Sequence, residues 1–337
     1  MINLKEKPLI GLTMGDPVGI GPEILVAALT DPFVYKICRP VIIGDLITIK
    51  KALKLKGISA QTNVIDSINK GIFSLNTIDI YQIGEKGFNN FSPACPNADT
   101  GKAMIEYILK GVSLAKKNLI DALVTCPITK TAMLLAGSKF HGHTELIASE
   151  TDTEEYAMML TGKRLKVVLV TIHIPLAEVS LKLDMQSIIK TIRVTHSSLK
   201  ERFGIKHPKI AVAGLNPHAG EDSMFGKEEE NIILPAVKFT KNEGLDISGP
   251  LPPDTVFYQA SLGKFDAVVS MYHDQGLAPF KMLHFKDGVN TTIGLPIIRT
   301  SVDHGTAYDI AFKGIADHSS LLSAIEMAVL QANNSLN

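Results

Sequence analysis

The chain has 337 residues, of which 45% are hydrophobic, and its 34 basic and 34 acidic residues give a formal net charge of zero. This balance argues against bulk nucleic-acid binding, which needs a basic surface. The length predicts either two domains or one elongated domain, with a sizeable buried core. The N-terminus shows no signal-peptide pattern, and no window approaches the ~18 apolar residues of a membrane-spanning helix. We therefore expect a cytoplasmic protein that does not contact membranes.

The cysteines do not indicate a disulfide framework. Cys38, Cys95 and Cys126 are odd in number and form no CxxC pair, which argues against a zinc ribbon and fits a reducing compartment. Cys126 ends an apolar run and invites interpretation as a nucleophile. Because spacing identifies no His or Asn partner for it, we interpret it as a small buried residue.

Short apolar runs alternate with helical patterns along the chain, which is typical of an α/β sheet with crossover helices. The predicted strands are residues 8–14, 40–45, 121–126, 167–172, 209–215 and 266–272. The predicted helices are residues 22–29, 98–117, 184–203 and 319–332. Segment 156–175 reads as two strands joined by a tight turn, so we expect an antiparallel pair inside an otherwise alternating sheet.

Two lobes are the expected arrangement of these elements. We expect residues 1–130 and 305–337 in the first lobe and residues 131–304 in the second.

The GDPVGIGPE segment, residues 15–23, lies between a predicted strand and a predicted helix. Its glycines permit two interpretations: an anion site made by N–H groups at the helix N-terminus, or a tight strand-to-helix turn. The segment lacks the GK[ST] of a P-loop and does not match GxGxxG, so we do not expect a standard Rossmann cofactor site.

Three histidines, His173, His218 and His273, each follow a strand-like run within a few residues. Strands of an open α/β sheet present ligands at their carboxyl ends, so the three side chains are candidates to converge. Three imidazoles with an open fourth position are typical of a catalytic divalent-metal site. The alternative, three separate structural histidines, stays open at this point.

Donors suited to an anion follow His273 in the sequence. Lys281, Asn290 and Arg299 offer a point charge, an amide and a planar fork, which suit a phosphate or a carboxylate. His143 and Thr144 open a predicted helix and are further candidates, although helix capping is the expected role of Thr144 alone.

One further segment and four acidic residues near these motifs are also candidates for functional or structural roles. Segment 303–306 precedes a predicted helix and is another candidate contact for an anion or a cofactor. Asp254 is either a partner that orients a metal-bound imidazole or a turn residue. We interpret Glu221, Glu228 and Glu229 as acidic residues at a helix start, where the helix dipole favours them.

The motifs together carry a family resemblance. GDPVGIGPE, GHTE, NPHAGE, PPDTVF, YHDQG and GLPIIRTSVDHGTA, in this order, closely resemble those of the 4-hydroxythreonine-4-phosphate dehydrogenase (PdxA) family of vitamin B6 biosynthesis. The resemblance covers residues 7–330, and YHDQG and RTSVDHGTA are its specific parts.

The resemblance implies a three-layer α/β/α fold like that of isocitrate and isopropylmalate dehydrogenases, with two lobes and a cleft. It implies homodimers whose active sites lie at the subunit interface. One divalent ion per subunit (zinc, magnesium or cobalt) would be bound by His173, His218 and His273, with both subunits contributing. The substrate-binding residues it implies are His143, Thr144, Lys281, Asn290 and Arg299. It implies no particular cofactor-contacting residue.

The implied reaction is oxidation of the C3 alcohol of 4-phosphooxy-L-threonine by NAD or NADP. The 2-amino-3-oxo product then loses CO2 to give 3-amino-2-oxopropyl phosphate. A divalent ion favours such an oxidation by lowering the pKa of the alcohol, and the nicotinamide accepts the hydride.

Three alternatives stay open. The same chemistry fits D-threonate or D-erythronate 4-phosphate, which carry a hydroxyl where the amino group would be. A phosphate acyltransferase shares the broad fold but has no role for the three histidines. A metal- or phosphate-binding sensor without enzymatic activity is the third.

Overall fold

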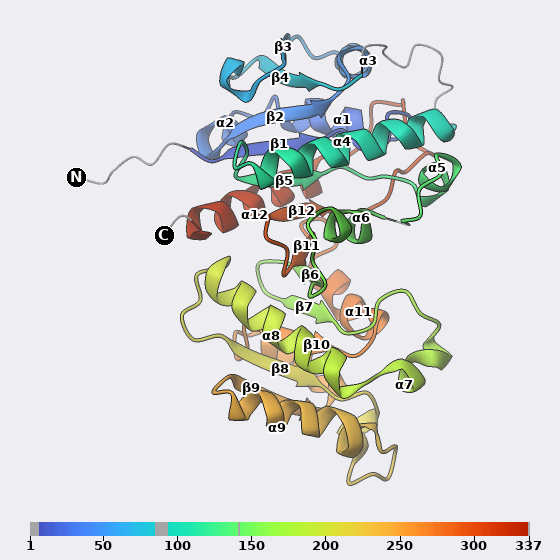
Figure 1. Cartoon of the computed structure of the whole chain (residues 1–337), viewed down its shortest axis with the longest axis vertical. Helices are drawn as coiled ribbons and strands as arrows, with labels where there is room; N and C mark the ends of the chain where they lie inside the picture. Colours follow the sequence, from blue (N-terminus) through green and yellow to red (C-terminus); the bar gives the residue numbers. More distant parts are fainter. Residues whose placement is uncertain (1–6, 85–93, 141, 336–337) are drawn as a thin grey trace, which may run out of the picture. The chain divides into compact units, whose positions relative to one another are not determined.

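The computed structural model describes residues 7–84, 94–140 and 142–335, and Figure 1 shows its helices and strands. None of the helices in these ranges is both long and apolar enough to cross a lipid bilayer.

The chain divides into two compact units. The first contains Met1–Glu154 and Leu295–Leu336, and the second contains Glu155–Gly294. The sequence analysis placed these divisions near residues 130 and 305. The second unit is thus one continuous segment, whereas the first is assembled from two separate stretches of chain.

The first unit is built on a parallel sheet with strand order β3-β4-β2-β1-β5-β12. Its strands are β1 (Leu9–Thr13), β2 (Arg39–Gly44), β3 (Gln61–Ile65), β4 (Thr77–Gln82), β5 (Ala122–Thr125) and β12 (Arg299–Val302). Every residue of β1, β5 and β12 is buried. Such continuous burial is expected where helices cover both faces of a parallel sheet.

The helices of this unit follow the strands in the alternating order that the sequence predicts. They are α1 (Gly21–Ala28), α2 (Pro32–Ile37), α3 (Leu46–Lys56), α4 (Ala98–Lys116), α5 (Lys130–Leu135), α6 (His143–Glu150) and α12 (Ser319–Ser335). Local sequence sets their ends: Asp45 caps α3 by accepting from the Ile47 N–H at 2.8 Å, and Gly57 ends it with φ +64°.

The second unit has a mixed sheet with strand order β11-β6-β7-β10-β8-β9. Its strands are β6 (Ala157–Thr161), β7 (Lys166–Leu169), β8 (Lys209–Ala213), β9 (Asp246–Leu251), β10 (Ala267–Ser270) and β11 (Val289–Ile293). β6 pairs antiparallel with both β7 and β11, which confirms the antiparallel pair predicted for segment 156–175. The other pairs, β7 with β10, β10 with β8 and β8 with β9, are parallel.

The helices of the second unit cover both faces of this sheet. They are α7 (Val179–Lys182), α8 (Met185–Glu201), α9 (Leu234–Asn242), α10 (Pro253–Ser261) and α11 (His273–Leu283). Strand side chains alternate between two cores. Val168 and Val212 pack with Ile192 of α8 in one core, and Val167 and Ala211 pack with Phe257 and Phe280 of α10 and α11 in the other. The predicted three-layer α/β/α class is confirmed.

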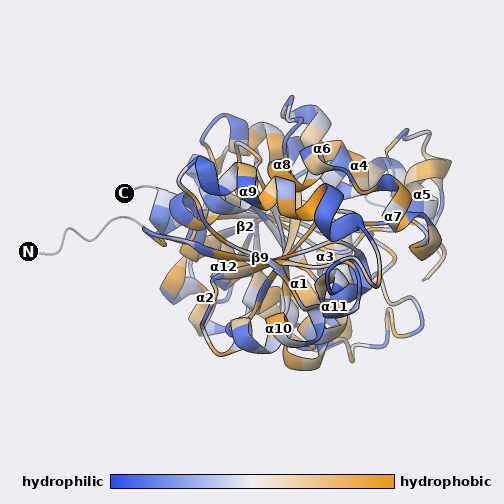
Figure 2. Ribbon diagram, turned by 90° about the horizontal axis from the view of Figure 1, so that it is seen from below, coloured by the Kyte–Doolittle hydropathy of each residue, from blue (hydrophilic) through white to orange (hydrophobic). Residues whose placement is uncertain are grey.

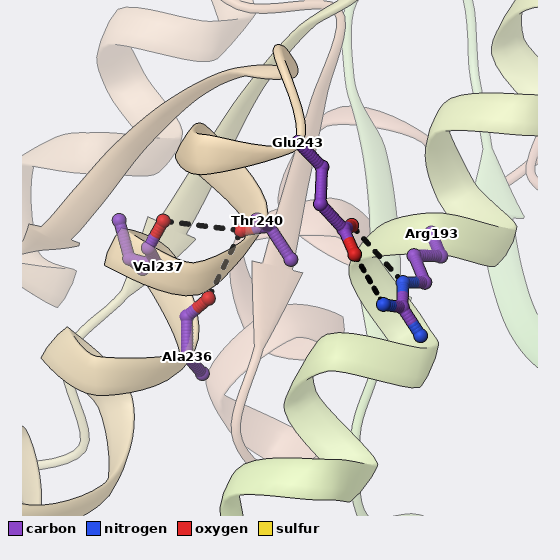
Figure 3. A network of polar contacts seen from close by, with 5 residues as sticks. All are labelled: Arg193, Ala236, Val237, Thr240 and Glu243. Atoms are coloured by element: carbon purple, nitrogen blue, oxygen red, sulfur yellow. Dashed lines mark hydrogen bonds and ion pairs between the residues drawn. The ribbon is translucent and has the colours of Figure 1, made fainter.

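Helices α8 and α9 lie side by side on one face of this sheet (Figure 1). Both carry hydrophobic and hydrophilic residues along their length (Figure 2), as expected for helices with one face on a core. Arg193 of α8 forms an ion pair with Glu243, which follows α9, and the Thr240 hydroxyl donates to the carbonyls of Ala236 and Val237 (Figure 3). The ion pair joins the solvent sides of the two helices.

Gly101 of α4 provides a test of the packing in the first unit. A Cβ at this position would lie 1.9 Å from the Ala132 carbonyl oxygen of α5. Helix propensity alone would favour Gly101→Ala by ~1 kcal/mol, but overpacking against backbone costs about 1–3 kcal/mol. We therefore expect Gly101→Ala to lower the free energy of unfolding, as measured by urea denaturation.

The control is Lys102→Ala on the exposed side of the same helix, which we expect to change the free energy of unfolding by less than about 0.5 kcal/mol. A more stable Gly101→Ala protein would show that α4 and α5 do not pack this closely.

Candidate active site

The three strand-end histidines follow three adjacent parallel strands. His173 comes after β7, His273 after β10 and His218 after β8, and β10 lies between the other two strands in the sheet. The carboxyl ends of parallel strands lie at the same edge of a sheet. The topology of the second unit therefore places the loops of all three histidines at one edge, as the sequence analysis expected.

The structure brings His173 and His273 together. Their ring centroids are 5.9 Å apart. The β7–β10 pairing continues past the strand ends, because the N–H and the hydroxyl of Thr171 both donate to the Met271 carbonyl, at 3.2 and 2.7 Å. This extension holds the His173 loop beside the start of α11, where His273 is the first residue.

Asp274 orients the His273 ring. Its Oδ1 lies 2.7 Å from His273 Nδ1. A carboxylate at Nδ1 favours the tautomer with the proton on that atom, which leaves Nε2 with a free lone pair for a metal. Sequence analysis did not select Asp274, although its place directly after a candidate ligand was the available signal.

His218 lies on a different part of the same edge. It is exposed, and its ring is 6.1 Å from that of Phe225. Within the described ranges of a single chain, no group of three or more His, Cys, Asp or Glu side chains is gathered closely enough to hold a metal ion. One chain thus assembles a pair of imidazoles and presents a third separately.

The imidazole pair fits a divalent ion. With metal–nitrogen bonds of about 2.1 Å, two imidazoles on one ion have ring centroids roughly 5–6 Å apart. The separation of His173 and His273 falls in this range, and imidazole nitrogen is a preferred donor for zinc and cobalt. The two rings alone would leave such an ion with further positions to fill.

Asp254 lies in the first turn of α10 and lines a cavity of about 550 Å³ between α10 and α11. Tyr272, the residue before His273, lines the same cavity. Asp254 is therefore placed near the histidine edge, and it belongs to a helix rather than to a turn.

Arg299 is the principal cation of the first unit's site. It is the first residue of β12 and only 3% exposed. Its Nε and Nη2 donate to the Thr125 hydroxyl at 3.2 and 2.8 Å, and Thr125 ends the neighbouring strand β5. Burial lowers the pKa of the guanidinium to about 10, with Glu145 opposing the effect, so Arg299 remains a cation at neutral pH. A buried guanidinium is suited to binding an anionic ligand.

His143 lies close to Arg299 and is neutral. Burial, together with the charge of Arg299, holds the pKa of this imidazole well below its usual value. Its Nε2 is buried with no hydrogen-bond partner among the described residues. An orphaned ring nitrogen beside a buried guanidinium is a polar group that a ligand can satisfy.

Thr144 is not the helix cap that we expected. Gly142 is the N-cap of α6, without a side-chain hydrogen bond, and Thr144 lies inside the first turn. Gly142 has an extended backbone, with φ −167° and ψ −176°, and glycine is among the residues accepted at an N-cap. Thr144 is left half-buried beside His143.

The GDPVGIGPE segment forms a tight strand-to-helix turn. The Val18 N–H donates to the Asp16 carboxylate, the Gly19 N–H to the Asp16 carbonyl, and the Ile20 N–H to the Thr306 carbonyl. Residues 15–23 are buried throughout. These three backbone donors are therefore used by the protein itself, which favours the interpretation as a turn.

Segment 303–306 does not precede a helix, and that prediction is wrong. Residues 303–318 form turns, and the next helix is α12. Gly305 and the turns that follow allow the chain to pack on the GDPVGIGPE turn instead: the Tyr308 hydroxyl donates to Asp16 at 2.5 Å. Burial raises the pKa of Asp16, against the effect of this hydrogen bond.

Lys281 and Asn290, the other two predicted substrate residues, belong to the second unit. Lys281 lies in α11 with its Nζ 5.7 Å from the ring centroid of Phe285. Asn290 lies in β11, opposite Leu160 of β6. His143, Thr144 and Arg299 belong to the first unit, so the predicted set is divided between the units.

The interpretation of Cys126 as a small buried residue agrees with the structure. Cys126 is fully buried, and burial raises the pKa of its thiol. A thiol kept protonated in this way is a poor nucleophile.

The profile of the family described as "Pyridoxal phosphate biosynthetic protein PdxA" matches residues 36–328. The chain belongs to this family. A 4-hydroxythreonine-4-phosphate dehydrogenase from Desulforapulum autotrophicum is 60% identical over 327 residues, which cover 97% of this chain and 96% of the relative. A D-threonate 4-phosphate dehydrogenase from Cupriavidus necator is 46% identical, covering 94% and 95%.

A solved structure agrees with this assignment. The crystal structure of 4-hydroxythreonine-4-phosphate dehydrogenase from Klebsiella pneumoniae has a TM-score of 0.90 and 41% identity to the chain, and the match covers 96% of this chain and 98% of that one. Membership of the PdxA family supports an oxidoreductase function.

Proposed function

We propose that this PdxA-family member oxidises the C3 alcohol of 4-phosphooxy-L-threonine with NAD or NADP. The product, 2-amino-3-oxo-4-phosphooxybutanoate, is a β-keto acid that loses CO2 to give 3-amino-2-oxopropyl phosphate for pyridoxal 5'-phosphate synthesis. The observation that carries the proposal is the 60% identity, over nearly the whole of both chains, to a relative with this name.

The anion-binding residues suit such a substrate. It carries a phosphate and a carboxylate, and the chain offers buried Arg299 with neutral His143 in one unit and Lys281 with Asn290 in the other. Thr125 fixes the guanidinium before the substrate arrives, so little side-chain freedom is lost on binding. The neutral His143 ring either donates or accepts a hydrogen bond through Nε2 without adding charge.

The metal-binding residues in this proposal are His173, His218 and His273. A bound zinc, magnesium or cobalt ion would supply Lewis-acid stabilisation of the negative charge that develops on the substrate during hydride loss. Asp274 holds the His273 ring in the tautomer that such binding requires. We propose no residue for contact with the nicotinamide.

A second substrate is supported by a specific relative. The Cupriavidus necator protein is named D-threonate 4-phosphate dehydrogenase and is 46% identical to the chain. D-Threonate 4-phosphate differs by a hydroxyl in place of the amino group, so the same residues could bind and oxidise it.

The substrate test is reduction of NAD and of NADP by the purified protein with 4-phosphooxy-L-threonine, D-threonate 4-phosphate or D-erythronate 4-phosphate. We expect turnover with 4-phosphooxy-L-threonine, its loss with a chelator, and its recovery on adding zinc, magnesium or cobalt. Preferred turnover of a sugar acid would assign the second function. Full activity in the chelated protein would contradict the role of the metal.

Arg299 tests the anion site directly. A charge-assisted hydrogen bond contributes about 1.5–3 kcal/mol, so we expect Arg299→Ala to raise KM by about ten- to a hundredfold at 1.4 kcal/mol per tenfold change. Arg299→Lys keeps the charge but loses the planar fork, and should recover only part of the effect. An unchanged KM in a folded Arg299→Ala protein, as judged by circular dichroism, would place Arg299 outside the site.

We further propose that the active protein is a cytoplasmic homodimer with each site at the subunit interface. Two observations support this proposal. Within one chain, the imidazole of His218 stands apart from the pair formed by His173 and His273, and an exposed apolar surface lies beside the α10–α11 cavity. Tyr258 and Met282 line this cavity and are 68% and 88% exposed. Exposed apolar groups that lie together commonly mark a protein–protein interface.

The dimer is tested with Met282→Glu, which adds a charge where the side chain is 88% exposed. We expect this variant to sediment as a monomer at concentrations where the wild type is a dimer, and to lose turnover. Leu181→Glu changes a side chain that is 83% exposed on α7 and is the matched control, which should remain dimeric. A fully active monomer would contradict the shared site.

A further inference from the structure

The loop that carries His218 has an unusual backbone. Six consecutive residues, 218–223, have positive φ values between 42° and 85°, and only Gly220 among them lacks a Cβ. Left-handed backbone is unfavourable for residues with a side chain beyond Cα, and it persists only where surrounding contacts hold it. Hydrogen bonds within the loop, such as that from the Phe225 N–H to the Gly220 carbonyl, hold part of it, and contacts with neighbouring residues hold the rest.

Glu229 holds the residues that lead into this left-handed stretch. Its side chain is 5% exposed, and Oε1 accepts from the N–H groups of Leu215 and Asn216 at 2.7 and 2.8 Å. Oε2 accepts from Asn216 Nδ2 at 2.9 Å. The carboxylate thus occupies the inside of the loop and satisfies two backbone donors directly before His218.

The glycines on each side of the loop leave room for this carboxylate and for little else. A Cβ at Gly220 would lie 2.9 Å from Glu229 Oε2, and a Cβ at Gly214 would lie 3.1 Å from Oε1. Glu229 begins a single π-helical turn, Glu229–Ile233, that leads into α9. Glu229 is thus an acidic residue at a helix start, as the sequence predicts, and its burial inside the preceding loop adds a role that the sequence does not reveal.

Gln275 ties the same loop to the one that carries His273. Its side chain is 8% exposed. Its Nε2 donates to the Gly214 carbonyl at 2.6 Å, and its Oε1 accepts from the Met271 N–H at 2.7 Å. One buried amide therefore joins the strand end before His218 to the strand end before His273.

The imidazole of His218 is exposed, so the fold does not depend on packing of that side chain. A buried carboxylate is costly unless it is fully hydrogen-bonded, and the three donors recorded here for Glu229 all belong to the loop. We propose that Glu229 is a positioning residue that holds the left-handed turn and so presents His218 to a divalent ion, with Gln275 keeping that turn in register with His273. The inference rests on the proposed metal site.

The test is a double-mutant cycle on zinc affinity, measured by calorimetry on the whole metal-free protein. We expect Glu229→Gln to weaken zinc binding by about ten- to a hundredfold, the range seen when groups that orient metal ligands are removed. Glu229→Gln in a His218→Ala protein should weaken it no further, because the ligand that Glu229 positions is already gone. A general loss of structure would lower the affinity in both backgrounds.

Glu243→Gln is the matched control, because this exposed carboxylate of the same unit bonds Arg193 rather than the loop; it should leave zinc affinity unchanged. If Glu229→Gln does not fold, Asn216→Ser replaces it in the cycle. This substitution removes the side-chain amide that donates to Glu228 and Glu229. It should weaken zinc binding less than Glu229→Gln does, and again only when His218 is present.

Unchanged affinity in a folded Glu229→Gln protein, or equal losses in both backgrounds, would overturn the positioning role. A wild-type protein that binds zinc no better than His218→Ala would instead overturn the proposed metal site itself.

Discussion

Parallel pairing of β10 with β7 on one side and β8 on the other is the constraint on which the candidate metal site depends. Parallel strands end at the same edge of a sheet, so the order β7-β10-β8 decides that His173, His273 and His218 share one edge. The hydrogen bonds of Thr171 to Met271 extend the first pairing, and Gln275 bridges the second. The imidazole pair and the separate third imidazole both follow from these contacts.

In the first unit, burial determines the protonation states of the candidate anion-binding residues. Arg299 loses part of its basicity through burial yet remains a cation, and His143 beside it remains neutral. The two side chains therefore divide their roles, one supplying charge and the other a hydrogen-bonding nitrogen. Thr125 makes this arrangement rigid without neutralising it, since a hydroxyl carries no charge.

Sequence periodicity predicts the apolar elements well and the polar ones poorly. The strands rich in Val, Ile and Leu, such as β7, β8 and β10, were predicted near their observed positions. β11 (VNTTI), β12 (RTSV) and β9 (DISGPL) were missed, because their Thr, Ser, Gly and Pro residues resemble loops until neighbouring strands cover them. Likewise, three candidate ligands were visible as histidines after apolar runs, whereas the strand order that brings two of them together depends on tertiary pairing. The contacts of Glu229 with the loop before it were not predicted, because an acid at a helix start already has an ordinary local explanation.

The division of the chain has a consequence for the order in which the protein is made. Thr125 and Arg299 are 174 residues apart in sequence, and the whole second unit is translated between them. Domains generally fold as units during synthesis, so the second unit emerges complete from the ribosome while the sheet of the first still lacks β12. The nascent first unit must therefore wait with an open edge at β5, and its buried guanidinium is among the last groups to reach its place.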